Sequence, residues 1–179
     1  MAMNDNFSIF NQFLQNMNNM TYRNNGAIGA LLDEYERALN DLKNVLSTIT
    51  HTELITIVDE KTTDVDCRSI QTILAHVVRA GYNYVTYIRN DQGESLDFRI
   101  SMPLDSAAAY KDALDAMFAY NVQLFEDYPN LKLEEYDTSK KMLMRWGQYY
   151  DVDQLMEHAI VHILRHRRQI ERFLLKMKE

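Results

Sequence analysis

Four long segments with apolar side chains at three- and four-residue spacing constrain the fold of this chain most. In a helix, such residues form one stripe that must pack against another element. The pattern predicts helices over residues 27–48, 66–89, 104–127 and 151–179. Five Gly and two Pro residues are too few for the turns of a β-sandwich or barrel. We therefore expect an all-α fold, a four-helix bundle with long crossover connections.

The chain length and one local signal suggest how the domain is organised. A chain of 179 residues is within the range of a single domain. We expect residues 26–179 to form that domain and residues 1–25, rich in Asn and Gln, to be an N-terminal extension that packs on the bundle. The dipeptide before Gly26 is Asn-Asn, which is typical of a turn at this boundary.

The connections between the segments carry weaker signals. Residues 50–67 are rich in Thr and Asp and are expected to form a loop with a short strand at 55–58. Another short extended piece is expected at 141–145. Asp151 and Gln154 have the spacing of a capping box, which predicts the start of the last helix. Arg and Lys residues toward the C-terminus of that helix suit the negative end of its dipole.

Charge and hydropathy argue against some classes of partner. The formal charge of −7 and the pI near 5.2 would repel a phosphate backbone, so no nucleic-acid partner is expected. No apolar run approaches the roughly 20 residues of a membrane span, and the N-terminus lacks a basic start followed by an apolar stretch. We expect a soluble, cytoplasmic protein that does not contact a membrane.

Cys67 is the only cysteine of the chain. No intramolecular disulfide framework can form, which agrees with a reducing compartment. A nucleophilic cysteine needs an activating base nearby, and the sequence shows none for Cys67. We expect its role to be structural.

Four of the five histidines fall on predicted core helices, and His158, His162 and His166 follow one another at four-residue steps. Each step advances a helix by about 6 Å and turns it about 40° beyond a full turn, so neighbouring imidazoles can converge on one ion. An i, i+4 pair supplies two ligands. A third must come from a facing helix, and His76, on the apolar stripe of the second segment, is the expected donor.

Two alternatives remain open on spacing alone. A histidine on an apolar helix face is often a hydrogen-bonded core residue, and i, i+4 pairs also occur by chance on surfaces. Arg165 and Arg167, beside the histidines, equally suit a solvated face.

Three motifs resemble those of the DinB-like and YfiT-like metalloprotein superfamily. The first is SIQTILAH at residues 69–76, which resembles the signature of that family's second helix. The second is WGQYY at residues 146–150, which resembles the segment leading into its fourth helix. The third is HILRHRRQI at residues 162–170, which is similar to the family's motif H-x-x-x-H-R-G-Q-I. The motifs are short, but their order and separation match over most of the chain.

The resemblance implies a four-helix bundle, often a homodimer, with a three-histidine site for nickel, zinc or a similar divalent ion. Carried over to this sequence, the ligands are His76, His162 and His166. Arg168 stands where the family usually has Gly, which alters packing or charge beside the pocket.

Two further side chains are candidates near the ligands. His158 has no equivalent ligand in the family; it is either a group beside the pocket that carries protons or a packing residue. Gln169 is expected to hydrogen-bond the second nitrogen of a ligand imidazole, as metal sites commonly require. The aromatic residues near the histidines either wall a substrate pocket or pack in the core or a dimer interface; they are Tyr82, Tyr84, Tyr87, Trp146, Tyr149 and Tyr150.

Two classes of function follow from these expectations. Three imidazoles leave positions on the metal for water, thiol or substrate. The resemblance implies a hydrolase or a thiol S-transferase or isomerase that acts on a small molecule, in the second case with a low-molecular-weight thiol. The spacing of the carboxylates relative to the histidines does not indicate a general base, which weakens the hydrolase hypothesis. The alternative is a non-catalytic, metal-binding or stress-associated dimeric protein; a weaker one is a dimeric packing module without metal.

Overall fold

The fold is seen in a computed structural model that describes residues 22–179. Residues 1–21, most of the predicted N-terminal extension, lie outside the described residues, so the packing expected of this segment stays a prediction.

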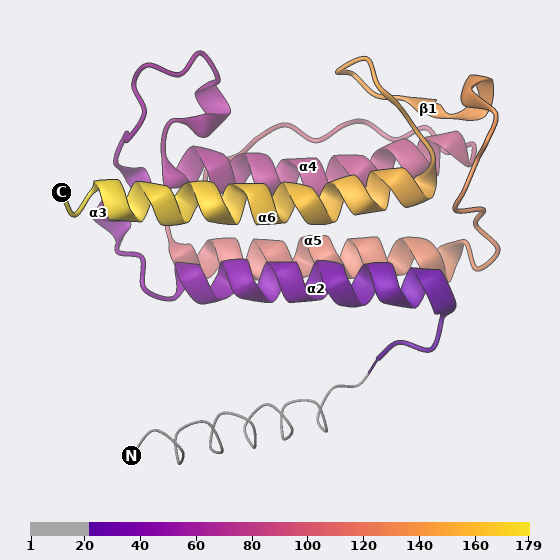
Figure 1. The fold of residues 1–179 in the computed structure, drawn as a ribbon, viewed down its shortest axis with the longest axis horizontal. Coiled ribbons are helices and arrows are strands. Elements are labelled where there is room, and N and C mark those ends of the chain that lie inside the picture. Colours follow the sequence, from indigo (N-terminus) through magenta and orange to yellow (C-terminus); the bar gives the residue numbers. More distant parts are fainter. Residues whose placement is uncertain (1–21) are drawn as a thin grey trace, which may run out of the picture.

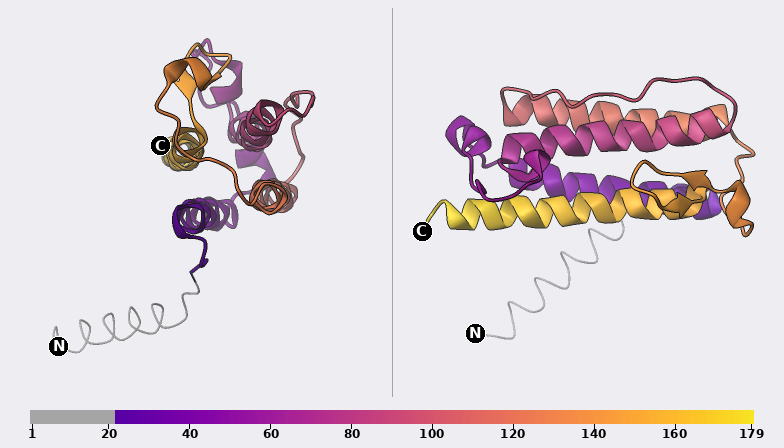
Figure 2. Two further views of the ribbon diagram at one scale, coloured as in Figure 1. Left: turned by 90° about the vertical axis from the view of Figure 1, so that its right-hand side faces the viewer. Right: turned by 90° about the horizontal axis from the view of Figure 1, so that it is seen from above.

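Four long helices run alongside one another (Figure 1). They are α2 (Gly26–Leu46), α4 (Ile70–Asp91), α5 (Ala107–Asp127) and α6 (Val152–Lys176). Helix α2 packs against α5 and α6, and α4 packs against the same two helices. The end-on view in Figure 2 shows the four axes surrounding one interior. The predicted all-α class is confirmed.

The helix starts follow from capping side chains. Asp151 accepts a hydrogen bond from the backbone N–H of Gln154, and the Gln154 side chain accepts one from the backbone of Asp151, as the capping box predicts. Ser69 caps α4 in the same way with Thr72. Ser106 caps α5, so this helix begins three residues after the predicted residue 104.

The segment between α2 and α4 differs from the expectation. Residues 55–58 do not form a strand; Ile57 only makes an isolated bridge to Ser69. The helix α3 (His51–Ile55) forms instead, because Thr50 and Glu53 make a capping box that stabilises its first turn. The predicted helix start at Asp66 is also wrong, since Asp66 lies in a short 3₁₀ helix, η1 (Val65–Cys67).

A small hairpin precedes α6. Strand β1 (Met142–Leu143) pairs antiparallel with β2 (Tyr149–Tyr150), and a second 3₁₀ helix, η2 (Thr138–Lys140), comes just before it. Of the extended piece predicted at 141–145, residues 142 and 143 form a strand. The hairpin contacts the last turns of α4 and the first turns of α6.

The core lies between the long helices and is lined by the apolar stripes that predicted them. Its largest fully buried side chains include Tyr35, Leu39, Ile73 and Leu114. Gly81 of α4 leaves room for the side chain of Met117 on α5, which a Cβ atom at residue 81 would overlap. Between residues 22 and 179, no helix is both long and apolar enough to cross a membrane.

Candidate metal centre

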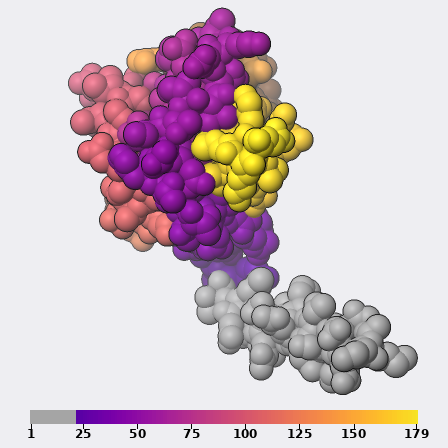
Figure 3. Space-filling view, turned by 90° about the vertical axis from the view of Figure 1, so that its left-hand side faces the viewer, coloured from indigo at the N-terminus to yellow at the C-terminus, as the bar shows by residue number. Residues whose placement is uncertain are grey.

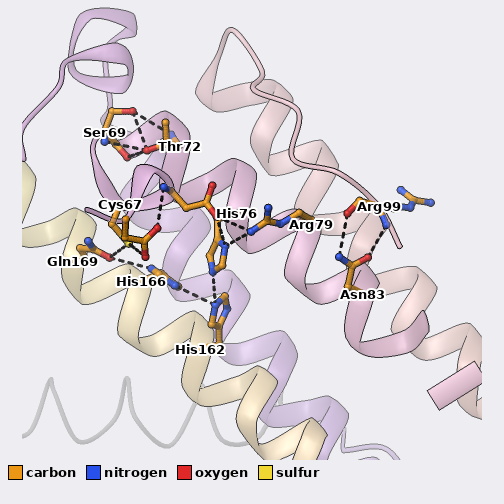
Figure 4. Close-up of polar contacts among 12 residues, drawn as sticks. Cys67, Ser69, Thr72, His76, Arg79, Asn83, Arg99, His162, His166 and Gln169 are labelled. Carbon is orange, nitrogen blue, oxygen red and sulfur yellow. Dashed lines mark hydrogen bonds and ion pairs between the residues drawn. The ribbon is translucent and has the colours of Figure 1, made fainter. Parts of the chain in front are cut away.

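Three imidazole rings from two helices meet between α4 and α6 (Figure 4). His76 lies on α4, and His162 and His166 lie one turn apart on α6. The Nε2 atom of His162 is 2.9 Å from Nε2 of His76 and 3.1 Å from Nε2 of His166. The ligand atoms of the three residues all lie within 4.8 Å of one another. Such a group of three histidines could hold a metal ion.

The pair on α6 faces the interior of the protein. His162 is 8% exposed and His166 is 5% exposed, whereas His76 is half-buried. The flanking arginines point elsewhere: Arg165 is exposed, and Arg167 Nη1 donates to Asp41 Oδ2 on α2 at 2.6 Å. The alternative of a solvated histidine face is therefore wrong.

The spacing of the nitrogens agrees with coordination of one ion. With metal–nitrogen bonds of about 2.0–2.1 Å, two nitrogens are about 3.3 Å apart in a tetrahedral site and about 2.9 Å apart at right angles in an octahedral one. The two measured separations of 2.9 and 3.1 Å need only small adjustments for either geometry. No carboxylate or thiol among residues 22–179 belongs to the group. Neutral imidazoles of this kind suit zinc, nickel, copper or iron.

Gln169 sets the orientation of the His166 ring. Its Oε1 atom is 3.0 Å from His166 Nδ1. An amide oxygen only accepts, so the contact places the proton of the neutral ring on Nδ1 and leaves the Nε2 lone pair facing the other two histidines. This is the hydrogen bond expected of Gln169.

Asp66 and Arg79 both reach the outer nitrogen of His76. Asp66 Oδ2 is 3.2 Å from His76 Nδ1, Arg79 Nη2 is 2.8 Å from the same atom, and Arg79 Nη2 is 2.6 Å from Asp66 Oδ2. Either Nδ1 donates to the carboxylate, or it accepts from the guanidinium. A metal bound at Nε2 requires the first arrangement, because the coordinating nitrogen must carry the lone pair.

Sequence reasoning missed both of these partners of His76. Arg79 follows His76 by three residues on one helix, a spacing that brings side chains together and so offered a signal. Asp66 lies in η1, outside any periodic segment, and offered none.

Burial keeps the three histidines neutral. It lowers the pKa of His162 to about 2 and that of His166 to about 4, and it also lowers the pKa of His76. The neighbouring imidazoles add to the effect on His162, because a second positive charge beside a first one is unfavourable. The neutral ring is the form that binds metal.

His158 lies beside the group of three and is not part of it. Its ring stacks on Trp146 with centroids 5.5 Å apart and is 6.1 Å from the ring of His162. Its Nδ1 atom is 3.3 Å from the hydroxyl of Tyr150. Tyr84 contacts the edges of both His158 and His162.

The remaining aromatic candidates lie farther from the three histidines. Tyr87 packs on Phe98 and Trp146, Tyr82 packs on Tyr120, and Tyr149 is half-exposed. Of the six, Tyr84, Trp146 and Tyr150 therefore surround His158 and form an aromatic wall at the hairpin end of the site.

Cys67 lies closer to the site than the sequence indicated. Its Sγ atom is 3.8 Å from Gln169 Oε1, the oxygen that contacts His166. Burial raises the pKa of the Cys67 thiol, so it is not an activated nucleophile. Arg168, which stands where the resembling motif has Gly, is exposed on the outer side of α6.

Comparison with known proteins gives no match, either to a protein-family model or to a curated protein. The resemblance to the DinB-like superfamily thus stays a prediction drawn from the three motifs.

Proposed function

We propose that this chain is a metal-dependent enzyme of the DinB-like kind, in which the four long helices form a four-helix bundle around one divalent transition metal. His76, His162 and His166 would hold the ion, with nickel and zinc the expected metals. One observation carries the proposal: the Nε2 atoms of half-buried His76 and buried His166 lie 2.9 and 3.1 Å from Nε2 of buried His162, across two facing helices.

The residues around the three histidines fit a ligand role. Asp66 and Gln169 contact the Nδ1 atoms of two of the rings and so direct their Nε2 lone pairs to a common point. Burial lowers the pKa of all three rings and so holds them in the neutral form that binds metal. When bound, a divalent ion with three imidazole ligands lowers the pKa of a water or thiol in a remaining position.

The surroundings favour thiol transfer over hydrolysis. Asp66, the carboxylate that contacts His76, is also paired with Arg79, so it is not free to act as a general base. An ordinary thiol has a pKa near 8.5 and water one near 15.7, so a thiol needs far less activation at neutral pH. We therefore propose a thiol S-transferase that uses a low-molecular-weight thiol and a small electrophilic substrate, with hydrolysis as the second possibility.

A homodimer and a cytoplasmic location belong to the same proposal, because the resemblance and the single cysteine suggest them. The competing function is that of a non-catalytic metal-binding protein, in which the ion stabilises the fold.

Metal content is the first test. Elemental analysis of the purified wild-type protein should give close to one metal ion per chain, and His162→Ala should give close to none. His51→Ala is the matched control, because His51 lies exposed on α3 and its Nδ1 atom is 3.0 Å from the backbone oxygen of Asp105, outside the group of three histidines. Metal content near zero in the wild-type protein after supplementation with nickel and zinc would refute the site.

Thermal unfolding with and without a chelator separates the two functions. If the ion is catalytic, the metal-free protein stays folded; if it is structural, its removal unfolds the chain. Transfer of a low-molecular-weight thiol to 1-chloro-2,4-dinitrobenzene, measured on metal-loaded wild type and His162→Ala, then tests the reaction class. Equal rates in the two proteins would remove the transferase proposal.

A further inference from the structure

A cavity of about 900 Å³ lies on the outer side of α6 and is lined in part by Gln169, which contacts His166. Three arginines line it at successive turns of the helix, Arg165, Arg168 and Arg172. The apolar part of its lining comes from Val161, Leu164 and Phe173. Asp59, in the segment between α3 and α4, also lines the cavity, and Lys176 Nζ of α6 donates to Val58 O in the same segment. Figure 3 shows the end of the molecule where the C-terminus of α6 lies beside this segment.

The charge on this wall is unbalanced. In the part of the chain that the structure describes, none of the three guanidinium groups has a hydrogen bond or an ion pair, whereas Arg79 and Arg89 are paired with carboxylates. Four cationic side chains line the cavity against two acidic ones, although the chain as a whole has a charge of −7. Neighbouring unpaired cations repel one another, and an anion among them would remove that repulsion.

The type of residue indicates the kind of anion. A guanidinium group is planar and presents paired N–H donors that match the two oxygens of a carboxylate or phosphate. Residues 165, 168 and 172 are three and four positions apart, so their side chains project from one side of the helix. The apolar residues beside them suit a carbon skeleton rather than a bare inorganic ion.

Gln169 connects the cavity to one of the three histidines, His166. Gln169 lines the cavity, and the Oε1 atom of the same residue contacts His166 Nδ1 at 3.0 Å. Arg165 also lines the cavity and directly precedes His166 in α6.

We propose that this cavity binds a small organic oxyanion, a carboxylate or phosphate ester, held by Arg165, Arg168 and Arg172 beside the metal centre. That this anion is the electrophilic substrate rests on the proposed function. Its charged end lies on the arginines, its carbon skeleton lies on Val161 and Leu164, and its reactive end lies on the Gln169 side. Arg168 makes this substrate class particular to the chain, since the resembling motif has Gly at that position.

Calorimetric titration of the full-length protein tests the anion site directly. Inorganic phosphate and glutarate are the two probes, so that the experiment distinguishes phosphate from carboxylate recognition. The double variant Arg165→Gln/Arg168→Gln should bind the preferred probe about tenfold more weakly or worse, because each lost contact is a charge-assisted hydrogen bond. The matched control is Arg37→Gln/Lys132→Gln, which removes the same charge from exposed residues paired with Glu34 and Glu135; it should bind like the wild type. Equal affinity in the two double variants, or no binding of either probe, would overturn the proposal.

Paramagnetic relaxation tests the position of the anion. With cobalt in the histidine site, the ³¹P or ¹³C signal of the bound probe should relax faster than in the zinc-loaded protein, and the arginine variant should lose this effect while retaining its cobalt. A bound probe that does not sense the cobalt would refute the placement beside the metal. If the wild-type protein binds no metal, the proposed function fails; arginine-dependent binding in the same metal-free protein would still uphold the anion site.

Discussion

Replacement of Asp66 by Asn should weaken metal binding although Asp66 is not a ligand. In the arrangement that metal binding requires, the carboxylate accepts from His76 Nδ1, 3.2 Å away, and so holds the ring with its Nε2 lone pair toward His162. The Asp66→Asn variant keeps the size of the side chain and removes its charge. It also leaves Arg79 Nη2, 2.8 Å from His76 Nδ1, without its anionic partner.

The expected loss of affinity is about tenfold to thirtyfold. Removal of a group that orients a metal ligand typically costs about 10–100-fold in metal affinity. The lower part of that range applies because the contact of 3.2 Å is longer than a normal charge-assisted hydrogen bond of about 2.7–2.9 Å. A factor of ten corresponds to about 1.4 kcal/mol.

Competition with a chromophoric chelator for zinc and for nickel measures the effect. Asp91→Asn is the control, because it removes the same charge far from the site. Asp91 is exposed at the end of α4 and, with a rise of 1.5 Å per residue, lies about 22 Å along the helix from His76. It should bind metal as the wild type does. Unchanged affinity in Asp66→Asn, with the fold intact by circular dichroism, would refute the assigned orientation of His76.

Three further predictions concern stability and the neighbours of the site. The free energy of unfolding of the metal-free protein should decrease as the pH falls from about 6.5 to about 4. In this range histidines of the unfolded chain become protonated, whereas His166 stays neutral in the folded protein; His166 alone should account for a decrease of about 3 kcal/mol. Urea unfolding at several pH values in this range measures how the free energy of unfolding depends on pH, and His166→Asn should weaken that dependence. A free energy of unfolding that does not change with pH would contradict the burial of these histidines. Gly81→Ala should destabilise the protein by about 1–3 kcal/mol through overlap with Met117, and an unfolding midpoint equal to that of the wild type would exclude so tight a contact between α4 and α5. His158→Phe keeps the stacking position and should leave the metal content at one ion per chain by elemental analysis; loss of the ion would make residue 158 a ligand.

The helices could be predicted from the sequence because each has one long apolar stripe and a local start signal. Asp151 with Gln154 and Ser69 with Thr72 are short-range pairs, so neither depends on the rest of the fold. The α3 helix has an equally local pair in Thr50 and Glu53, but the many Thr and Asp residues and the weak periodicity of residues 50–67 favour a loop.

The three histidines could be predicted only in part from spacing. The four-residue step between His162 and His166 is a property of one helix, whereas the approach of His76 depends on how two helices pack. The roles of Asp66, Cys67 and Asp59 depend on the path of a connection without periodicity, which no local pattern encodes. The arginines of α6 were read as partners of the helix dipole; their shared cavity emerges only when the segment between α3 and α4 is placed against them.

A crystal structure of the full-length protein, supplemented with nickel or zinc and measured at the absorption edge of that metal, tests the central claim most directly. We predict a single anomalous peak between α4 and α6 at about 2.0–2.1 Å from the Nε2 atoms of His76, His162 and His166. No peak at that point, or a peak bonded to other residues, would contradict the account.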